Sequence, residues 1–577
     1  MGTIADKLTR IITTKEDIRQ ALISKGYDVP TSIPFKEYAK MISDLPCRVD
    51  SFPDIEGIVA RYSALGLTNE QMAENPVWKD LTGNGHDLQM KNFAWKGMSG
   101  VGGYVVDIDE WGTNTTAAYF ERNSIKITAT FKENVSLGLL YHNIKLRQSC
   151  VLKVTGIPEG CDAFLDDRLG NRFYMSEDGV YEIIPSNFLA EALYLSIEKY
   201  PERWYGSKLT IEQLPLYPGA LVFDGVDDYG TCDNFPILTK EKGYTVVALR
   251  QWISMGEGIS GLVSNVKNWL NDGAFVLEYN SNNATNKFVN RPVSFGNVNI
   301  EMDLPNNFTY QTSKSYKGVP ITTGSFKGTN SLFVGKLNNI IGNCSNVAIW
   351  ELVFLDHDAT EEELTKIKDN FVKTYPWLFP DQAWTVVGKT NEDEDRATIA
   401  NITGNDNNLV LSNLGFIEGS GYNKEGEYAG YLVTDGVDDK IVSSAFGMGK
   451  DFTIVGDWKF IDNKKSGSGL VKGSSFYIYN TMIGLDLYIN SGSVKNSLDG
   501  IKSINAACSD GRAYDRNWNE ILANTGNVVG SGGALEVSSS GGRFDRIAFK
   551  NLAIYPRILS KDDCIKAYNY LQTLKAK

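Results

Sequence analysis

The chain has 577 residues, of which 42% are hydrophobic and 22% charged, a composition typical of a folded protein. A chain of this length exceeds what one hydrophobic core can organise, so about three or four domains are expected. The net charge of −13 and the lack of any Lys/Arg-rich run exclude an evident nucleic-acid-binding surface.

The first twenty residues, MGTIADKLTRIITTKEDIRQ, mix charged and apolar residues and contain no apolar core of a signal peptide. No apolar stretch approaches the roughly 18 residues that cross a bilayer, so no membrane span is expected. The seven cysteines are odd in number and show no CxxC spacing, which favours free thiols made in a reducing cytoplasm. Only Cys150 and Cys161 are close enough in sequence to raise the question of a bridge.

Residues 1–46 predict three short helices. Thr14 is placed to cap the second helix, Gly26 to end it, and Pro34 to lie in the first turn of the third. A segment this small can hardly fold alone, so it is either a cap packed on the next domain or a docking or oligomerising element.

The segments IADKLTRI, KEDIRQALISKGYDVP and PFKEYAKMI resemble the N-termini of tailed-phage virion appendage proteins. This resemblance implies that residues 1–46 attach the chain to other virion proteins, and that the protein forms a homo-oligomer.

A duplicated domain is the strongest pattern in the sequence. Asp-Gly-Val-Asp-Asp occurs at 224–228 and again at 435–439. Three other blocks recur in the same order: TNE at 68–70 and 390–392, TGNGHDLQMKNFAW at 82–95 with TGNDNNLVLSNLGF at 403–416, and NVAIWELVFLDHDATEEEL at 346–364 with NLAIYPRILSKDDCIKAY at 551–568. Four blocks in one order predict two copies of one domain.

The first copy contains an insertion. Gly83 and Asp224 lie 141 positions apart, whereas their counterparts Gly404 and Asp435 lie only 31 apart. About 110 additional residues, near 105–217, therefore separate two parts of the first copy, as when a folded domain enters a surface loop. Its alternating runs SIKITATF, SCVLKVTGI, GVYEIIP and KLTIEQL predict a small immunoglobulin-like β-sandwich.

The predicted fold class is mainly β. The parent copies read as two antiparallel sandwiches, at 50–104 with 218–380 and at 384–577, each ending in a helix capped by Thr360 or Ser560. The ordered motifs GNGHDL, LVFDGVDDY and NVAIW resemble the laminin-G/concanavalin-A-like lectin sandwich, in the form found in crAss-like gut-phage virion proteins and bacterial surface proteins.

The repeated aspartates are the candidate site residues. Asp-Gly favours a turn between strands, because Asp accepts local backbone hydrogen bonds and Gly adopts a positive φ. The alternative is a calcium site, since hard cations prefer carboxylate and carbonyl oxygens, and related lectin sandwiches often bind calcium. The candidate metal ligands are Asp224, Asp227, Asp228, Asp435, Asp438 and Asp439.

No catalytic constellation stands out, and no enzyme is expected. Glycoside hydrolases of the concanavalin-like superfamily need two carboxylates facing one sugar, yet no Glu-x-Asp-x-Glu run is present. Asp107 and Asp109 lie at the edge of the insertion, and Glu392 and Glu394 in an expected loop. The histidines fit no catalytic motif: His86, His142 and His357. Five tryptophans are expected in the cores: Trp78, Trp95, Trp252, Trp350 and Trp458.

These patterns favour a non-enzymatic component of a phage virion, a head or tail fibre, made in the host bacterial cytoplasm. It would attach through residues 1–46 and present lectin-like domains to a host surface or glycan, with weak sugar binding amplified by many copies. The alternatives are a cellular glycan-binding lectin, a divergent glycoside hydrolase, and a structural virion protein that binds no sugar.

Overall fold

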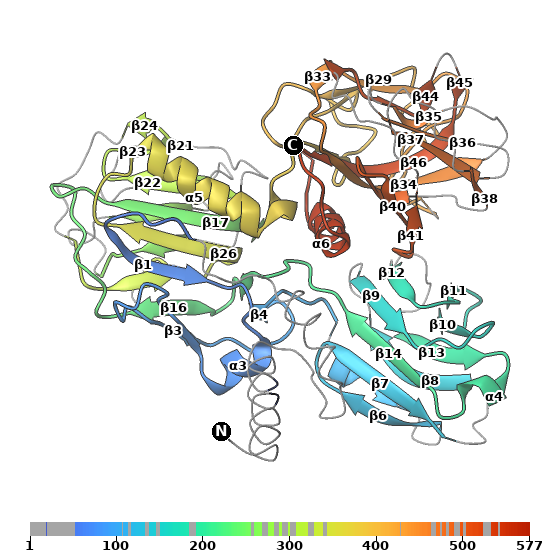
Figure 1. Cartoon of the computed structure of the whole chain (residues 1–577), viewed down its shortest axis with the longest axis horizontal. Helices are drawn as coiled ribbons and strands as arrows, with labels where there is room; N and C mark the ends of the chain where they lie inside the picture. The colour runs from blue at the N-terminus through green and yellow to red at the C-terminus, as the bar shows by residue number, and fades with distance from the viewer. Residues whose placement is uncertain are drawn as a thin grey trace, which may run out of the picture. The chain divides into compact units, whose positions relative to one another are not determined.

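The computed structural model describes Lys15, Arg19 and residues 52–576, except for short stretches within 107–149, 184–191, 255–306, 321–342, 463–503 and 523–542, and residue 427. The chain divides into two compact units, Met1–Asp54 and Ile55–Lys577. Apart from Lys15 and Arg19, which are helical, the predicted helices of residues 1–46 lie outside the described residues. The second unit is built from antiparallel sheets (Figure 1), so the predicted mainly β fold is confirmed.

The first sandwich consists of two eight-stranded sheets. In order across the first sheet are β24 (Val319–Pro320), β23 (Ser315–Tyr316), β22 (Phe308–Thr312), β17 (Thr245–Ser254), β26 (Asn346–Leu355), β15 (Leu221–Asp224) and β4 (Gly100–Val101), and β1 (Ile58–Ser63) also pairs with β26. The second sheet contains β2 (Val77–Trp78), β3 (Leu88–Lys91), β16 (Tyr229–Cys232), β25 (Leu332–Val334), β18 (Ile259–Ser264), β19 (Val276–Ser281), β20 (Phe288–Asn290) and β21 (Val298–Asn299).

The central strand β26 is buried along almost its whole length. Its sequence, NVAIWELVFL, is a nearly continuous apolar run because both faces are covered. One face joins the core between the sheets, and helix α5 (Glu361–Thr374) lies on the other side of this sheet (Figure 1). Phe371 of α5 packs edge-on against Phe308 of β22. Thr360 caps α5, as the sequence predicts, and Glu363 completes a capping box with it.

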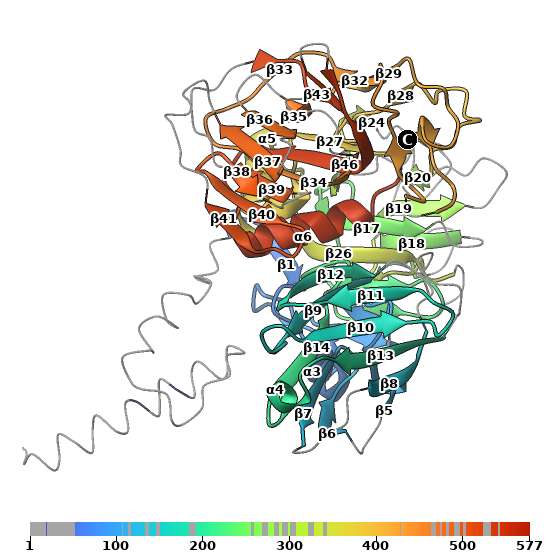
Figure 2. The ribbon, with the colours of Figure 1, turned by 90° about the vertical axis from the view of Figure 1, so that its right-hand side faces the viewer.

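The insert is a sandwich of two five-stranded sheets with its own core (Figure 2). The sheet that contains all four predicted strands is formed by β12 (Gly179–Ile183), β9 (Cys150–Thr155), β14 (Lys208–Gln213), β7 (Lys126–Phe131) and β6 (Ala118–Arg122). The opposite sheet, which sequence patterns did not identify, contains β11 (Arg172–Met175), β10 (Asp162–Asp166), β13 (Ala192–Glu198), β8 (Gly138–Lys145) and β5 (Gly112–Thr113).

The second sandwich repeats the strand order of the first. One sheet contains β30 (Gly421–Tyr422), β31 (Leu432–Val433), β46 (Arg546–Tyr555), β34 (Thr453–Asp462), β39 (Ile504–Cys508), β40 (Arg512–Asp515) and β41 (Glu520–Leu522), with β27 (Gln382–Thr385) also on β46. The other contains β28 (Thr398–Ile399), β29 (Leu409–Ser412), β32 (Lys440–Ser443), β43 (Glu536–Val537), β35 (Gly469–Lys472), β36 (Phe476–Asn480), β37 (Gly484–Ile489) and β38 (Ser497–Asp499).

Short elements complete the fold. Two further pairs of strands are β33 (Phe446–Gly447) with β42 (Gly532–Gly533), and β44 (Ser539–Ser540) with β45 (Arg543–Phe544). The other helices bounded within the described residues are α3 (Asn69–Glu74), α4 (Pro201–Trp204), α6 (Lys561–Gln572), η1 (Ile108–Glu110) and η3 (Pro376–Leu378). Ser560 caps α6, as predicted.

The structure corrects one block of the predicted repeat. The match of NVAIW with NLAIY, which paired 346–364 with 551–568, is wrong by five residues. The central strands β26 and β46 correspond along their full length, so NVAIWELVFL matches RIAFKNLAIY. Equivalent threonines fix this register: Thr245 donates to the carbonyl of His357, and Thr453 donates to that of Arg557. NVAI and NLAI resemble each other only because both are fragments of a buried, largely apolar β-strand.

Helix α6 contacts the insert and both parent sandwiches. Tyr568 donates a hydrogen bond to Glu182 of β12, in the insert. Asn307, in the first sandwich, donates to the hydroxyl of Tyr570 at 3.0 Å, and Gln251 of β17 donates to Thr573 at the end of the helix. The three sandwiches are therefore joined through polar contacts of one helix.

Two findings bear on the earlier expectations about membranes and thiols. Among the described residues, no helix is long and apolar enough to cross a membrane. The cysteines that the structure describes are buried free thiols: Cys150, Cys161, Cys232, Cys344, Cys508 and Cys564.

Candidate functional site

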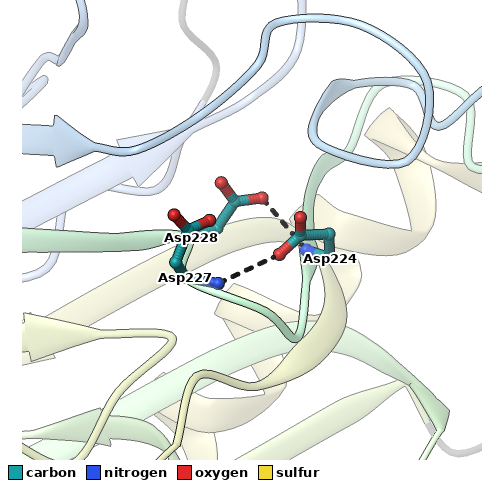
Figure 3. A group of neighbouring side chains, drawn as sticks. All are labelled: Asp224, Asp227 and Asp228. Atoms are coloured by element: carbon teal, nitrogen blue, oxygen red, sulfur yellow. Dashed lines mark hydrogen bonds between the residues drawn. The ribbon is translucent and has the colours of Figure 1, made fainter.

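The first Asp-Gly-Val-Asp-Asp loop joins β15 to β16, and hydrogen bonds hold its carboxylates in place (Figure 3). Asp224 Oδ1 accepts from the backbone N–H of Val226 at 2.7 Å and from that of Asp227 at 3.4 Å. Asp228 is fully buried; one of its oxygens accepts from the Asp224 N–H and the other from the Ser99 hydroxyl. These are bonds that shape a turn, and they fasten it to the chain before β4.

The second loop repeats these bonds. Asp435 accepts from the N–H of Val437, and Asp439 accepts from the Asp435 N–H and from the Ser420 hydroxyl. In both copies an asparagine with positive φ fastens the loop from outside: Asn92 donates to the carbonyl of Asp227, and Asn413 to that of Asp438. The duplication therefore preserves a whole network and not only the five-residue motif.

The two loops also bring together ligand atoms suited to a cation. One carboxylate oxygen from each aspartate of a loop lies within 4.8 Å of the others, in both copies. Calcium takes six to eight oxygen ligands, however, and the buried members, Asp228 and Asp439, already accept hydrogen bonds from the loop. Three carboxylates would have to be completed by carbonyls or water. The calcium assignment therefore stays a prediction.

Burial makes the Asp228 carboxyl a weaker acid than an exposed aspartate. The pKa of Asp228 is raised to about 7. Removal of the carboxylate from water is the main cause, the charges of Asp224 and Asp227 act in the same direction, and the hydrogen bonds from the Asp224 N–H and Ser99 partly oppose them. Burial likewise raises the pKa of Asp439. Between the unfolded pKa of about 4 and the folded value, the folded state binds more protons, so this group reduces stability as the pH rises through that window.

We therefore expect Asp228→Asn to gain stability relative to the native chain as the pH rises from 5 to 8, because asparagine carries no charge at either pH. Asparagine keeps only one of the two acceptor oxygens, a loss that is the same at both pH values. Calorimetric melting of both proteins at the two pH values measures this difference, and Asp439→Asn should behave alike. A variant that instead loses stability at pH 8, and does so only when calcium is present, would establish the metal role.

Among the residues that the structure describes, the other candidates from the sequence are not brought together in a catalytic arrangement. Within the described residues, the two aspartate loops are the groups of three or more acidic, His or Cys side chains that could hold a metal, and no histidine joins them. Glu392 lies in a turn and forms an exposed ion pair with Lys424. Asp107 lies outside the described residues. The expected core role holds for the tryptophans that are almost fully buried: Trp78, Trp252, Trp350 and Trp458, while Trp95 is partly buried beside the core.

Sequence patterns missed a buried polar cluster between the two sheets of the first sandwich. Glu278 of β19 is 3% exposed and accepts hydrogen bonds from Trp252, Thr309 and Tyr316, at 2.9, 2.7 and 2.6 Å. Arg250 of β17 pairs with both of its oxygens. Burial raises the pKa of this carboxyl, but Arg250 and the hydrogen bonds outweigh it and lower the pKa to about 2. Every acceptor site faces a protein donor, which is the arrangement of a structural ion pair.

Comparisons with known proteins find similar structures but no related sequence. No known protein family matches the chain, and no curated protein matches it either. A mutant of Trypanosoma rangeli sialidase with trans-sialidase activity is 10% identical, with a TM-score of 0.26, over 47% of this chain and 49% of its own, so this chain spans about half of it.

Two other structures cover more of their own length. The covalent intermediate of T. rangeli sialidase with 2,3-difluorosialic acid is 9% identical over 79% of this chain and 84% of its own, with a TM-score of 0.25. The binding domain of botulinum neurotoxin serotype D is 11% identical over 60% of this chain and 89% of its own, with a TM-score of 0.23. At these values none of the three supports an argument about activity.

Proposed function

We propose that the protein is a non-enzymatic component of a phage virion, a head or tail fibre, that displays its β-sandwiches for contact with glycans on a host surface. Residues 1–46 attach it to other virion proteins. The lectin-like and virion parts of this proposal come from the sequence resemblance, and the non-enzymatic part comes from the site.

The observation that carries the non-enzymatic part is the state of the repeated aspartates. Hydrolysis of a glycosidic bond needs two carboxylates facing one substrate across a gap of about 5–10 Å. The carboxylates of Asp224 and Asp228 instead accept hydrogen bonds from their own turn, and those of Asp435 and Asp439 do the same in the second copy. Catalysis by one pair of carboxylates gives no reason to repeat the same turn contacts in a second copy. A protein that displays many binding surfaces does gain from repetition of one module.

A glycan array probed with the full chain tests this function, with and without EDTA. Products released from bound glycans are measured on the same samples. We expect binding to a subset of glycans and no cleavage. Cleavage of any glycan would show an enzyme, and a chain that binds nothing on the array would be a structural protein without a sugar ligand.

A further inference from the structure

The exposed aromatic side chains among the described residues all lie in the insert. They are tyrosines: Tyr119 of β6, Tyr174 of β11, and Tyr200 and Tyr205 beside α4. The second sandwich repeats the parent fold without an insert, so these rings belong to an added module and not to the repeated sandwich. Exposed apolar surface gathered on one part of a folded protein marks a binding face, and tyrosine suits such a face because its ring is apolar and its hydroxyl is polar.

One of these rings lies on the outer face of a sheet of the insert, where β11, β10 and β13 are neighbouring strands (Figure 2). Ala163 and Leu165 of β10 belong to the core of the insert, so Phe164 between them points outward. The register places Phe164 opposite Tyr174 on one side and opposite Ser196 on the other, so the three strands share this face. The same alternation turns four further side chains to it: Asp166, Arg172, Tyr194 and Glu198.

The side chains of this face hold one another in place. The Arg172 guanidinium lies 4.7 Å from the centre of the Phe164 ring and donates to the Tyr174 hydroxyl at 3.2 Å. The centres of the Phe164 and Tyr174 rings are 5.4 Å apart. Arg168, in the turn between β10 and β11, lies 3.9 Å from the centre of the Tyr194 ring. Side chains that are already fixed lose little conformational entropy when a ligand binds, so this face is preorganised.

The charges of this face cancel. Together with Lys199, which follows β13, the face carries three cations and three carboxylates: Arg168, Arg172, Lys199, Asp162, Asp166 and Glu198. Arg172 pairs with Glu198 at 3.7 Å, and Lys199 pairs with Asp162. A charged ligand would gain no net attraction here. Sugar hydroxyls both donate and accept hydrogen bonds, so they match guanidinium and carboxylate groups that lie side by side.

We infer that this outer face of β11, β10 and β13 binds an uncharged oligosaccharide. The C–H face of a sugar ring packs on Tyr174, which is 42% exposed, while sugar hydroxyls donate to Asp166 and accept from Arg172. This inference rests on the proposed contact with glycans, and it adds a location on the insert and a ligand class.

An array of uncharged oligosaccharides, with sialylated and uronic acid glycans on the same slide, tests the inference when it is probed with the full chain and with Tyr174→Ala. We expect the native chain to bind uncharged glycans, and the variant to need at least about tenfold more protein for half-saturation. Tyr119→Ala is the matched control and should bind like the native chain. Tyr119 is also an exposed tyrosine of the insert with a cation over its ring, Lys132 at 4.8 Å, but it lies on β6 of the opposite sheet.

Nitration of the native chain by tetranitromethane gives a second reading that needs no variant. The uncharged glycan that binds most strongly on the array should protect Tyr174 and leave Tyr119 reactive, as read from the masses of their peptides. Equal array binding by Tyr174→Ala, or equal nitration of Tyr174 with and without that glycan, would overturn the assignment of the face and leave the proposed glycan contact standing. A native chain that binds only acidic glycans would also overturn it, and one that binds no glycan would remove the proposed contact as well.

Discussion

We expect Glu278→Leu to lower the free energy of unfolding of the first sandwich by about 3–5 kcal/mol, the largest effect of any single change considered. The substitution removes the carboxylate that holds the buried Arg250 guanidinium through two contacts. It also removes the acceptor for Trp252, Thr309 and Tyr316. The Thr309 hydroxyl can still donate to that of Tyr316, 3.3 Å away, so the loss of the carboxylate from Arg250 is the larger effect.

The second sandwich suggests a control variant for Glu278→Leu. Where β17 pairs Arg250 with Ile349, β34 pairs Trp458 with Phe549, so an apolar side chain occupies the place of the arginine. We therefore expect the double variant Arg250→Met/Glu278→Leu to recover most of the stability that Glu278→Leu loses.

Hydrogen exchange of the full chain in urea measures these changes in stability, because peptides from each sandwich report on it separately. A single two-state fit does not apply to a chain of several domains. Peptides of the second sandwich should be unchanged. A single variant that loses less than about 1 kcal/mol would show that the buried pair is not a stabilising centre.

The second large effect concerns the junction of the insert with the second sandwich. Lys550 of β46 is 15% exposed and pairs with Glu182 of the insert at 3.3 Å and with Asp457 of β34 at 3.7 Å. Burial lowers the pKa of Lys550, but the two carboxylates outweigh this and raise it. Tyr431 and Tyr568 donate to the same carboxylates.

We expect Lys550→Met to destabilise this junction by about 3 kcal/mol, because two carboxylates remain largely buried without their cation. Exchange protection should fall in β12 of the insert and in α6 together. Lys459→Met is the matched control: both ammonium groups lie over the Tyr431 ring, at 4.5 and 5.6 Å for Lys459 and Lys550, but only Lys550 pairs with Glu182. An equal effect of the two variants would argue against the ion cluster.

The sequence predicts what depends on local patterns. The aspartate motif, Asn92 and Ser99 all recur at matching positions in the second copy, and the structure joins them in one hydrogen-bond network. The starts of helices α5 and α6 could also be predicted from the sequence, because a threonine or serine N-cap has a local signature.

Other features depend on partners far away in the chain. Glu278 lies in an apolar run, GAFVLEY, that predicts only a strand, and its partner Arg250 comes from the opposite sheet. Glu182 and Lys550 are 368 positions apart. The shift of five residues in the match of β26 with β46 arose because short pieces of a largely apolar strand look alike in several registers.

The measurement that tests the central claim most directly is immunogold electron microscopy of purified phage particles, with antibody against residues 384–577. We predict gold on discrete projections of the particle, which would also show whether the protein belongs to the head or the tail. Label found on the bacterial cell surface, with particles unlabelled, would contradict the virion assignment and favour a cellular lectin.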